Sequence, residues 1–472
     1  MMGTQFFWLA KQELVLALVI FLLLIIKTGS RTYSNTSVLN LVNALLLVNF
    51  LAGFIAPADG ILFNEMFHTN TLVTIEKNIL NLGTLIVSMQ GYEWLKTHKH
   101  VIEFYVLLLS TLMGMFFMIS AGHLLMFYLG LELASIPLAA LANFDLAKRQ
   151  SSEAAFKYII SSAFSSGLLL FGISLLFGTT GSLLFSDLPA LLTGGPLQIF
   201  ALVLLIAGFA FKISAVPFHW WTADVYEGAP VTVSAYLSVV SKGAAVFVFV
   251  YFLYLVAKPM AAAWYTILFI LGVLTMLIGN LFAVRQQSVK RLLAFSSIAQ
   301  AGFILVGISG SSQAGSASVV YFILIYVLSN LGAFGVASVV SALSGKESIN
   351  DYKGFYRTNP FLSWVMAIAL FSLAGIPPAA GFFGKFFLLF AGAGKGNYAL
   401  VIIAALNMVI AFYYYLRLVR AMFFDRADQE PIPSLDLNWY PKIGLGICLV
   451  GTLLLGFFGH VYEHIYSISI PF

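Results

Sequence analysis

Charged residues and cysteine are both scarce in this chain of 472 residues. Only 9% of the residues are Asp, Glu, Lys or Arg, whereas 61% are hydrophobic, and the mean hydropathy is +0.96. This composition excludes a water-soluble domain and is typical of a polytopic membrane protein. The single cysteine, Cys448, excludes an internal disulfide and any iron–sulfur or zinc site built from several cysteines.

The apolar segments have the length of membrane-spanning helices. They run for about 20 residues, which a helix needs to cross the hydrocarbon, whereas a transmembrane barrel would show alternating segments of about ten. We therefore predict an all-α polytopic membrane protein with about fourteen spans and no water-soluble domain. The predicted spans lie near residues 6–27, 38–57, 73–94, 102–119, 122–142, 154–178, 197–221, 229–255, 262–283, 290–308, 317–343, 361–391, 397–420 and 441–462.

The distribution of basic residues predicts how these spans are oriented. Of the 24 lysines and arginines, sixteen fall in or beside the loops after odd-numbered spans, and three, Lys11, Lys258 and Lys395, fall on the side of the termini. Because cytoplasmic loops are enriched in Lys and Arg, we place both termini outside the cytoplasm. The first apolar segment has no basic leader and no small-residue cleavage motif, so we expect a retained helix rather than a signal peptide.

Four charged residues interrupt spans that are otherwise apolar: Glu132, Lys212, Lys242 and Lys385. A charge at the centre of a spanning helix costs about 2.5–3.5 kcal/mol on insertion scales. Removal from water favours the neutral form of a lysine, which allows proton exchange near neutral pH. We predict that these side chains form a proton path. The structural alternative stays open, in which each charge snorkels to the surface or fixes helix packing.

Two predicted spans contain internal prolines. Pro217 follows Lys212 by five positions, and Pro377 and Pro378 precede Lys385. Proline removes a backbone donor and clashes with the preceding turn, so we predict that spans 7 and 12 are broken within the membrane. Broken helices in the two halves of a chain are typical of transporters built from inverted repeats.

Other polar residues are weaker candidates. We interpret Glu76 and Lys77 as a pair that snorkels to the membrane surface. We interpret Asp224 and Glu227 as members of a solvated cytoplasmic loop, with proton collection as the alternative. His219, just after Pro217, is either a proton relay or a hydrogen-bonded structural residue. No phosphate loop, dinucleotide motif or haem-binding histidine pair is apparent.

Several strings of residues together resemble the antiporter-like membrane subunits of respiratory complex I and of Mrp-type cation/proton antiporters. They lie at residues 127–133, 211–221, 224–231, 290–300 and 374–385, and the resemblance extends from about residue 100 to residue 425. Three features favour one branch of the complex I subunits within this family. These are Glu103-Phe104-Tyr105, a lysine at position 385 where a sister branch has glutamate, and the lack of a long lateral helix after the last span.

The resemblance implies a division of the chain into four parts. Two inverted five-helix repeats are expected at residues 101–256 and 257–425. They would lie between an N-terminal three-helix segment at residues 1–100 and a C-terminal helix at residues 426–472.

The resemblance also implies roles for the buried charges. It implies an ion pair between Glu132 and Lys212, a central relay at Lys242 and an exit-side site at Lys385. His219 and Gln300 are expected as further members of the path. Gln300 stands where the favoured branch often carries histidine, and because glutamine cannot titrate, a relay there requires water or another residue.

The function implied by the resemblance is that of a proton-translocating membrane subunit of a bacterial NADH:quinone oxidoreductase. The chain would lie in the cytoplasmic membrane beside other antiporter-like subunits. NADH, flavin mononucleotide, iron–sulfur clusters and quinone are expected on partner subunits, and no cofactor, metal or nucleic acid on this chain. Two alternatives stay open: a subunit of a Mrp-type Na⁺/H⁺ antiporter, and a structural scaffold subunit.

Overall fold

The protein is a bundle of membrane-spanning helices. The computed structural model describes residues 2–30, 33–55, 59–394, 396, 398–426 and 431–470, with side chains from residue 5 onward, so Lys395 lies outside the described residues. Among them, eleven helical segments are long and apolar enough to cross a membrane. These are α3 (Asn35–Ala52), α4 (Thr71–Gln90), α6 (Val101–Ile119), α7 (Leu124–Ala142), α8 (Arg149–Thr180), the run α12 (Val231–Tyr236), η1 (Leu237–Ser241), α13 (Lys242–Tyr251) and η2 (Phe252–Val256), then η3 (Lys258–Met260) with α14 (Ala261–Val284), α15 (Val289–Ser309), α16 (Gln313–Ser344), α20 (Tyr398–Phe423) and α21 (Trp439–Phe457).

Further helices complete the bundle. Three apolar ones are shorter than a full span: α10 (Pro196–Lys212), α18 (Pro360–Ala374) and α19 (Ala380–Ala393). The helix α2 (Lys11–Thr28) has the length of a span but carries three charged residues. The remaining elements are α1 (Met2–Leu9), α5 (Tyr92–Leu95), α9 (Leu188–Leu191), α11 (Trp220–Gly228), η4 (Ile349–Tyr352), α17 (Phe355–Thr358) and α22 (His460–Ile468).

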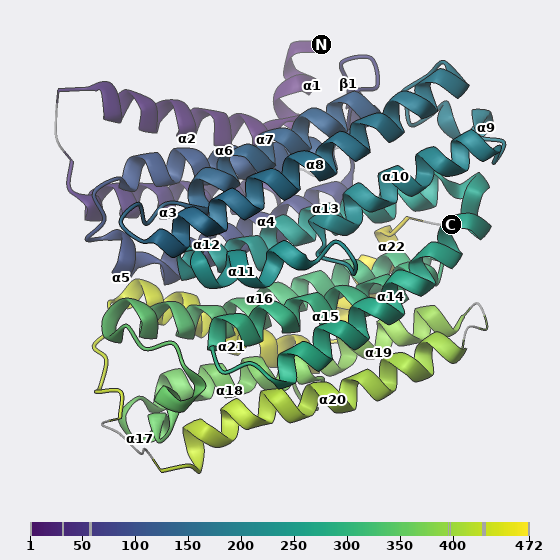
Figure 1. Ribbon diagram of the computed structural model, residues 1–472. Coiled ribbons are helices and arrows are strands. Elements are labelled where there is room, and N and C mark those ends of the chain that lie inside the picture. The colour runs from purple at the N-terminus through teal and green to yellow at the C-terminus, as the bar shows by residue number, and fades with distance from the viewer. Residues whose placement is uncertain are drawn as a thin grey trace.

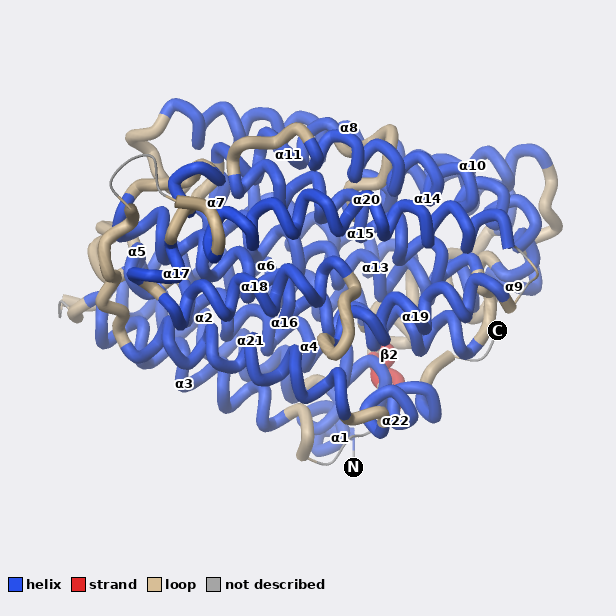
Figure 2. The backbone as a smooth tube through the Cα atoms, turned by 90° about the horizontal axis from the view of Figure 1, so that it is seen from below, coloured by secondary structure: helices blue, strands red, loops and turns tan. Residues whose placement is uncertain are grey.

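The helices lie side by side and roughly parallel to one common direction (Figure 1), and the view from below shows the same alignment (Figure 2). The N-terminal α2 lies at one edge of the bundle and α20 at the opposite edge. The helices α15 and α16 are almost completely buried, whereas only 33–39% of the residues in the apolar 18-residue stretches of α3, α8 and α20 are buried. Exposed apolar side chains such as Phe164, Phe171 and Leu406 are therefore available to lipid or to neighbouring subunits.

One hairpin departs from the predicted all-helical class. The strands β1 (Gly60–Leu62) and β2 (Phe67–Thr69) pair antiparallel, with Gly60 opposite Thr69. The hairpin is held to the bundle by the peptide N–H of His68, which donates to the carbonyl of Ser120 at 2.7 Å. Three residues per strand are too few to show the alternating pattern that marks a strand in sequence.

The interpretation of Glu76 and Lys77 as a snorkelling surface pair is wrong. Both side chains are buried, and Lys77 Nζ instead forms an ion pair with Glu13 of α2 at 2.6 Å. The rings of Phe67 and Phe116 lie 5.0 and 6.0 Å from the amine and close the site. Because Glu13 lies 64 positions earlier in the chain, adjacency in sequence suggested the wrong partner.

We predict that this buried ion pair fixes the N-terminal helices to the bundle. Lys77→Met or Glu13→Gln leaves one buried charge without its partner, which destabilises proteins by about 3–5 kcal/mol. The double variant Lys77→Met/Glu13→Leu removes both charges and is expected to recover much of that loss. The measurement is the thermal unfolding midpoint of the purified assembly.

A suitable control is Lys27→Met, because Lys27 pairs with Glu103 at the same 2.6 Å but with half-exposed side chains. Such pairs contribute only about 0–1 kcal/mol. Equal losses in the single and double variants at the buried pair would contradict the prediction.

Candidate functional site

The first predicted helix break is present. The helix α10 ends at Lys212 and α11 begins at Trp220, so residues 213–219, which include Pro217, lie outside both helices. The freed groups of this segment find partners inside the protein: the peptide N–H of Val216 donates to Thr275 Oγ1 of α14 at 2.9 Å. The indole N–H of Trp221 donates to the carbonyl of Phe211 at 3.3 Å. Irregular backbone at membrane depth requires partners of this kind.

The second predicted break is also present, between α18 and α19. Gly375 ends α18 with φ of +86°, a left-handed conformation that glycine adopts without steric cost. The hydroxyl of Ser372 accepts from the peptide N–H of Gly381 at 3.0 Å and from Ser329 Oγ at 2.6 Å. The last carbonyls of α18, at Leu373 and Ala374, are left to accept hydrogen bonds from side chains.

Lys212 lies at the first break, as the last residue of α10. Its amine donates to Ser135 Oγ of α7 at 2.6 Å and to Ser162 Oγ of α8 at 3.0 Å. A cation is favoured at this end of a helix, where the carbonyl groups point outward. Both serines supply neutral acceptors that adjust their own hydroxyl protons to the state of the amine.

The ion pair expected between Glu132 and Lys212 is not formed in this structure. Glu132 lies one turn before Ser135 on α7, and the Ser135 hydroxyl takes up the amine instead. The buried Glu132 Oε1 has no hydrogen-bond partner among the described residues. The carboxylate is nonetheless close enough for its charge to act on Lys212. A rotamer change of either side chain is therefore the physical route to a direct pair.

Lys242 lies in the middle of the bundle and is 1% exposed. It directly follows η1, a π-helical turn, and such turns occur frequently at functional sites. Its amine donates to the hydroxyl of Ser297 at 2.6 Å and to the carbonyl of the same residue at 3.0 Å. Lys242 thereby joins α13 to α15.

Lys385 lies at the second break and is fully buried. Its amine donates to the carbonyl of Leu373 at 2.6 Å and lies 4.6 Å from the centre of the Phe303 ring. Gln300 Nε2 donates to the same carbonyl at 2.9 Å. The negative end of α18 thus holds the ammonium group, and Gln300 brings α15 to the same point.

The structure therefore divides the predicted site residues into two groups. Lys242, Gln300 and Lys385 gather along α15, because Ser297 and Gln300 are one helical turn apart. Lys212 and Glu132 lie with the serines of α7 and α8. His219 directly precedes α11 at the first break; it is 5% exposed, and its Nδ1 has no hydrogen-bond partner among the described residues.

Several polar residues around Lys242 and Gln300 escaped the sequence reasoning. Asn330 Nδ2 donates to Ser238 Oγ at 2.9 Å and to Tyr326 Oη at 3.2 Å, and Gln300 Nε2 donates to Tyr415 Oη at 3.2 Å. For Tyr326 and Asn330 the sequence did contain a signal, because both are polar residues in the long stretch without Asp, Glu, Lys or Arg at residues 292–345.

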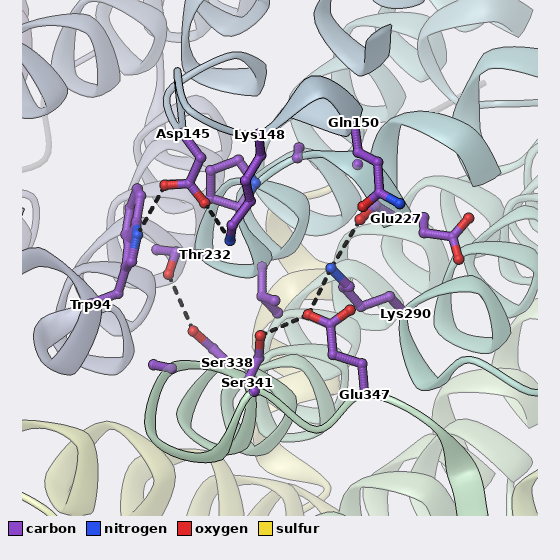
Figure 3. Close-up of a pocket in the computed structure, with 16 residues that line it drawn as sticks. Trp94, Asp145, Lys148, Gln150, Glu227, Thr232, Lys290, Ser338, Ser341 and Glu347 are labelled. Atoms are coloured by element: carbon purple, nitrogen blue, oxygen red, sulfur yellow. Dashed lines mark hydrogen bonds and ion pairs between the residues drawn. The ribbon is translucent and has the colours of Figure 1, made fainter. Parts of the chain in front are cut away.

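A cavity of about 450 Å³ opens at the end of the bundle that carries Lys148 and Lys290 (Figure 3). Its walls come from both predicted repeats, and Lys290 bridges them: its amine contacts Glu347 at 2.9 Å and the carbonyl of Glu227 at 2.9 Å. Between the walls, Thr232 and Ser338 share a hydrogen bond of 3.2 Å. A polar opening thus lies above the turn of α12 and η1 that leads to Lys242.

The interpretation of Asp224 and Glu227 as a solvated loop is wrong, because both lie on α11 and are ion-paired. Asp224 contacts Lys157 at 2.6 Å and Arg291 at 3.1 Å, and Arg291 contacts Glu227 at 2.7 Å. Lys157 and Arg291 each donate a charge-assisted hydrogen bond to the Asp224 carboxylate, at 2.6 and 3.1 Å. This cluster ties α11 to α8 and α15.

No cluster of three or more His, Cys, Asp or Glu side chains with the spacing of a metal site is found in the part of the chain that the structure describes.

Comparison with known proteins identifies the class. Residues 121–411 match the family described as NADH:quinone oxidoreductase/Mrp antiporter, TM. The structure of the Mrp complex from Dietzia contains a chain that superposes with a TM-score of 0.86 at 20% identity, over 97% of this chain and 96% of the other. A chain of respiratory complex I from Thermus thermophilus superposes with a TM-score of 0.79 at 30% identity, over 94% and 96%. Fold and match thus define an antiporter-like membrane subunit.

The individual relatives are more specific. NADH-quinone oxidoreductase subunit N of Phocaeicola vulgatus is 49% identical over 424 residues, 89% of each chain. The same subunit of Azobacteroides pseudotrichonymphae is 47% identical over 87% of this chain and 86% of the relative. The chain belongs to the family of NADH-quinone oxidoreductase subunit N, the proton-translocating membrane subunit of complex I, which confirms the branch favoured by the sequence.

We predict that Thr275 stabilises the first helix break. The substitution Thr275→Val keeps the shape of the side chain but leaves the peptide N–H of Val216 without its acceptor. A buried donor without a partner costs about 1–3 kcal/mol, so the unfolding midpoint of the assembled complex should fall. Thr266→Val on the same helix is the control, because Thr266 is exposed and bonds only within its own helix. Equal midpoints for both variants would contradict the prediction.

Proposed function

We propose that protons cross this chain through Lys242 and Lys385, with Lys212 and Glu132 as the group that couples the step to a neighbouring subunit. The observation that carries this proposal is the kind of partner each amine has. The hydrogen bonds of Lys212, Lys242 and Lys385 go only to serine hydroxyls and backbone carbonyls, and none of the three has an ion pair within the described residues. A neutral acceptor does not lock a lysine in its charged form, so these amines remain able to release a proton.

The step from Lys242 to Lys385 runs along α15. Ser297 holds the first amine, and Gln300 shares the Leu373 carbonyl with the second. The end of α18 favours a cation at Lys385, which makes the second lysine an acceptor for a proton leaving the first. From Lys385 the proton would leave on the side of the termini.

The proposed entrance is the cavity of Figure 3. Below its walls the polar side chains of Ser238 and Asn330 continue toward Lys242. The hydrogen bonds of Lys212 lead to α7 and α8 rather than to α13, which favours a role for Lys212 outside the entrance. Lys212 and the unpartnered carboxylate oxygen of Glu132 suit a switch that forms and breaks an ion pair.

The membrane topology proposed here has fourteen spans. It adds α2 and the two interrupted pairs, α10 with α11 and α18 with α19, to the eleven long segments. Two inverted repeats, at residues 101–256 and 257–425, are supported by matching elements. Each has a helix of 32 residues that ends at a left-handed glycine, Gly181 or Gly345, and an interrupted helix after it. Residues 1–100 and 426–472 flank the repeats.

The assembly proposed for this chain is a complex I in the bacterial cytoplasmic membrane. NADH oxidation and quinone reduction would occur on partner subunits, with neighbouring antiporter-like subunits beside this chain. Glu132 lies on the face of α7 that exposes Leu129 and Leu133, which suits contact with such a neighbour. The TM-score of 0.86 to a chain of the Mrp complex favours a sodium/proton antiporter as the second candidate; co-purification of quinone-reducing subunits separates the two.

We predict that Lys242→Met and Lys385→Met each leave the complex assembled but lower coupled proton translocation by at least about tenfold, since a positioned proton carrier is lost. The measurement is the ratio of protons to electrons in proteoliposomes. Lys442→Met, at an exposed lysine in the first turn of α21, is the control. Normal ratios in both path variants would overturn the proposal and favour a scaffold.

The orientation is tested by thiol labelling. In a Cys448→Ala background, Lys148→Cys and Thr193→Cys place one exposed thiol at each end of the bundle. An impermeant maleimide should label position 148 only in inverted membrane vesicles and position 193 only in intact spheroplasts. The reverse pattern would place the termini in the cytoplasm.

A further inference from the structure

The proposed route from Lys242 to Lys385 contains one group that cannot carry a proton. Gln300 bridges the two sides, but an amide neither gains nor loses a proton near neutral pH. Its Nε2 is occupied twice, by the carbonyl of Leu373 at 2.9 Å and by the hydroxyl of Tyr415 at 3.2 Å. The second of these contacts leads to a side chain that has the required chemistry.

Tyr415 reaches across from α20 and is fully buried. Its hydroxyl and that of Ser296 lie 2.5 Å apart, and either oxygen can be the donor. Hydroxyl groups both accept and donate, so this pair can pass a proton by exchanging roles. Ser296 precedes Ser297, the residue that holds Lys242.

A second buried phenol, Tyr326 of α16, belongs to the polar surroundings of Lys242. Its hydroxyl accepts from Asn330 Nδ2 at 3.2 Å, which fixes its position. The hydroxyls of Ser297, Ser296 and Tyr415 form a row of exchangeable groups that begins at the partner of Lys242 and ends beside Gln300.

We infer that Tyr415 is the proton carrier between Lys242 and Lys385 and that Gln300 is its positioning residue. The inference rests on the proposed route. The Lys242 ammonium gives a proton to Ser297, and the proton passes by way of Ser296 to Tyr415, each hydroxyl oxygen gaining one proton as it releases its own. The neutral amine of Lys385 takes up the last proton, so no charge stays on the hydroxyls.

Gln300 serves this transfer through geometry. The Nε2 atom of Gln300 donates to both the Tyr415 hydroxyl and the Leu373 carbonyl. Because the Lys385 amine donates to the same carbonyl, Gln300 keeps the phenol on the side of Lys385. Networks of buried hydrogen bonds of this kind fix side chains in one arrangement. A titratable side chain at position 300 is then unnecessary as long as the phenol is present.

The test is Tyr415→Phe, which removes one hydroxyl and keeps the ring. Proton translocation in proteoliposomes should fall by at least about fivefold, because a carrier is lost from the row. The chain offers a matched control in Tyr414→Phe. Tyr414 is adjacent and equally buried, and its ring centre lies 4.5 Å from that of Tyr415, but its hydroxyl donates to Asn280 Oδ1 at 3.0 Å. Equal rates in the two variants would overturn the inference.

Rescue separates a proton carrier from a packing residue. In the double variant Tyr415→Phe/Gln300→His, an imidazole that titrates near pH 6.5 stands beside the row. Translocation should recover, and the recovered rate should depend on pH between about 5.5 and 7.5. Failure of rescue in an assembled complex would contradict a carrier role for Tyr415.

The lysine variants distinguish this inference from the proposed function. If Lys242→Met and Lys385→Met translocate protons normally, the route itself is wrong. If the two lysine variants are inactive while Tyr415→Phe and Tyr414→Phe translocate protons at the same rate, the route stands and only the assignment of Tyr415 fails.

Discussion

The organisation of this protein depends on one constraint: an amine buried in a membrane protein must find oxygen atoms. Leaving such a group without a partner costs several kcal/mol, and the carbonyls inside a continuous helix already accept hydrogen bonds from the helix itself. The breaks in α10–α11 and α18–α19 remove this difficulty, because they free carbonyls at helix ends. Lys385 uses the end of α18 directly. Lys212 ends α10 itself and takes serine hydroxyls from the two neighbouring helices. The interruptions and the lysines are thus parts of one arrangement.

The same constraint explains the character of α15 and α16. These helices are almost wholly buried and carry no charge over residues 292–345, yet they contribute Ser296, Ser297, Gln300, Tyr326 and Asn330 to the surroundings of the lysines. Small polar side chains bring oxygen into the interior at much lower cost than carboxylates do. An apolar helix with scattered hydroxyls is therefore the form expected for a surface that faces a proton path.

Sequence predicted the membrane class, the two broken helices and the four charged positions, because each depends on a residue type that is costly in hydrocarbon and therefore informative wherever it occurs. It failed where the outcome depended on which helices meet. Lys77 pairs with Glu13 of α2 rather than with its neighbour Glu76, and Asp224 is held by Lys157 and Arg291 from distant helices. Ser135 displaced the expected contact between Lys212 and Glu132 for the same reason. Serine and tyrosine are common in apolar helices, so their positions carried no signal before the packing was known.

The two ways in which this chain stabilises a buried lysine have opposite consequences. Lys77 has a carboxylate at 2.6 Å and two aromatic rings around it, so loss of its proton would leave Glu13 charged and unpaired. That site holds its charge state and, with it, the position of α2. Lys242 and Lys385 have no carboxylate partner among the described residues and donate their hydrogen bonds to neutral oxygens, and a hydroxyl or carbonyl stays satisfied whether the nitrogen beside it carries two protons or three. Neutral partners therefore make a lysine exchangeable, whereas an ionic partner makes it permanent. By this criterion the N-terminal pair is an anchor, and the residues along α15 are the ones suited to conduction.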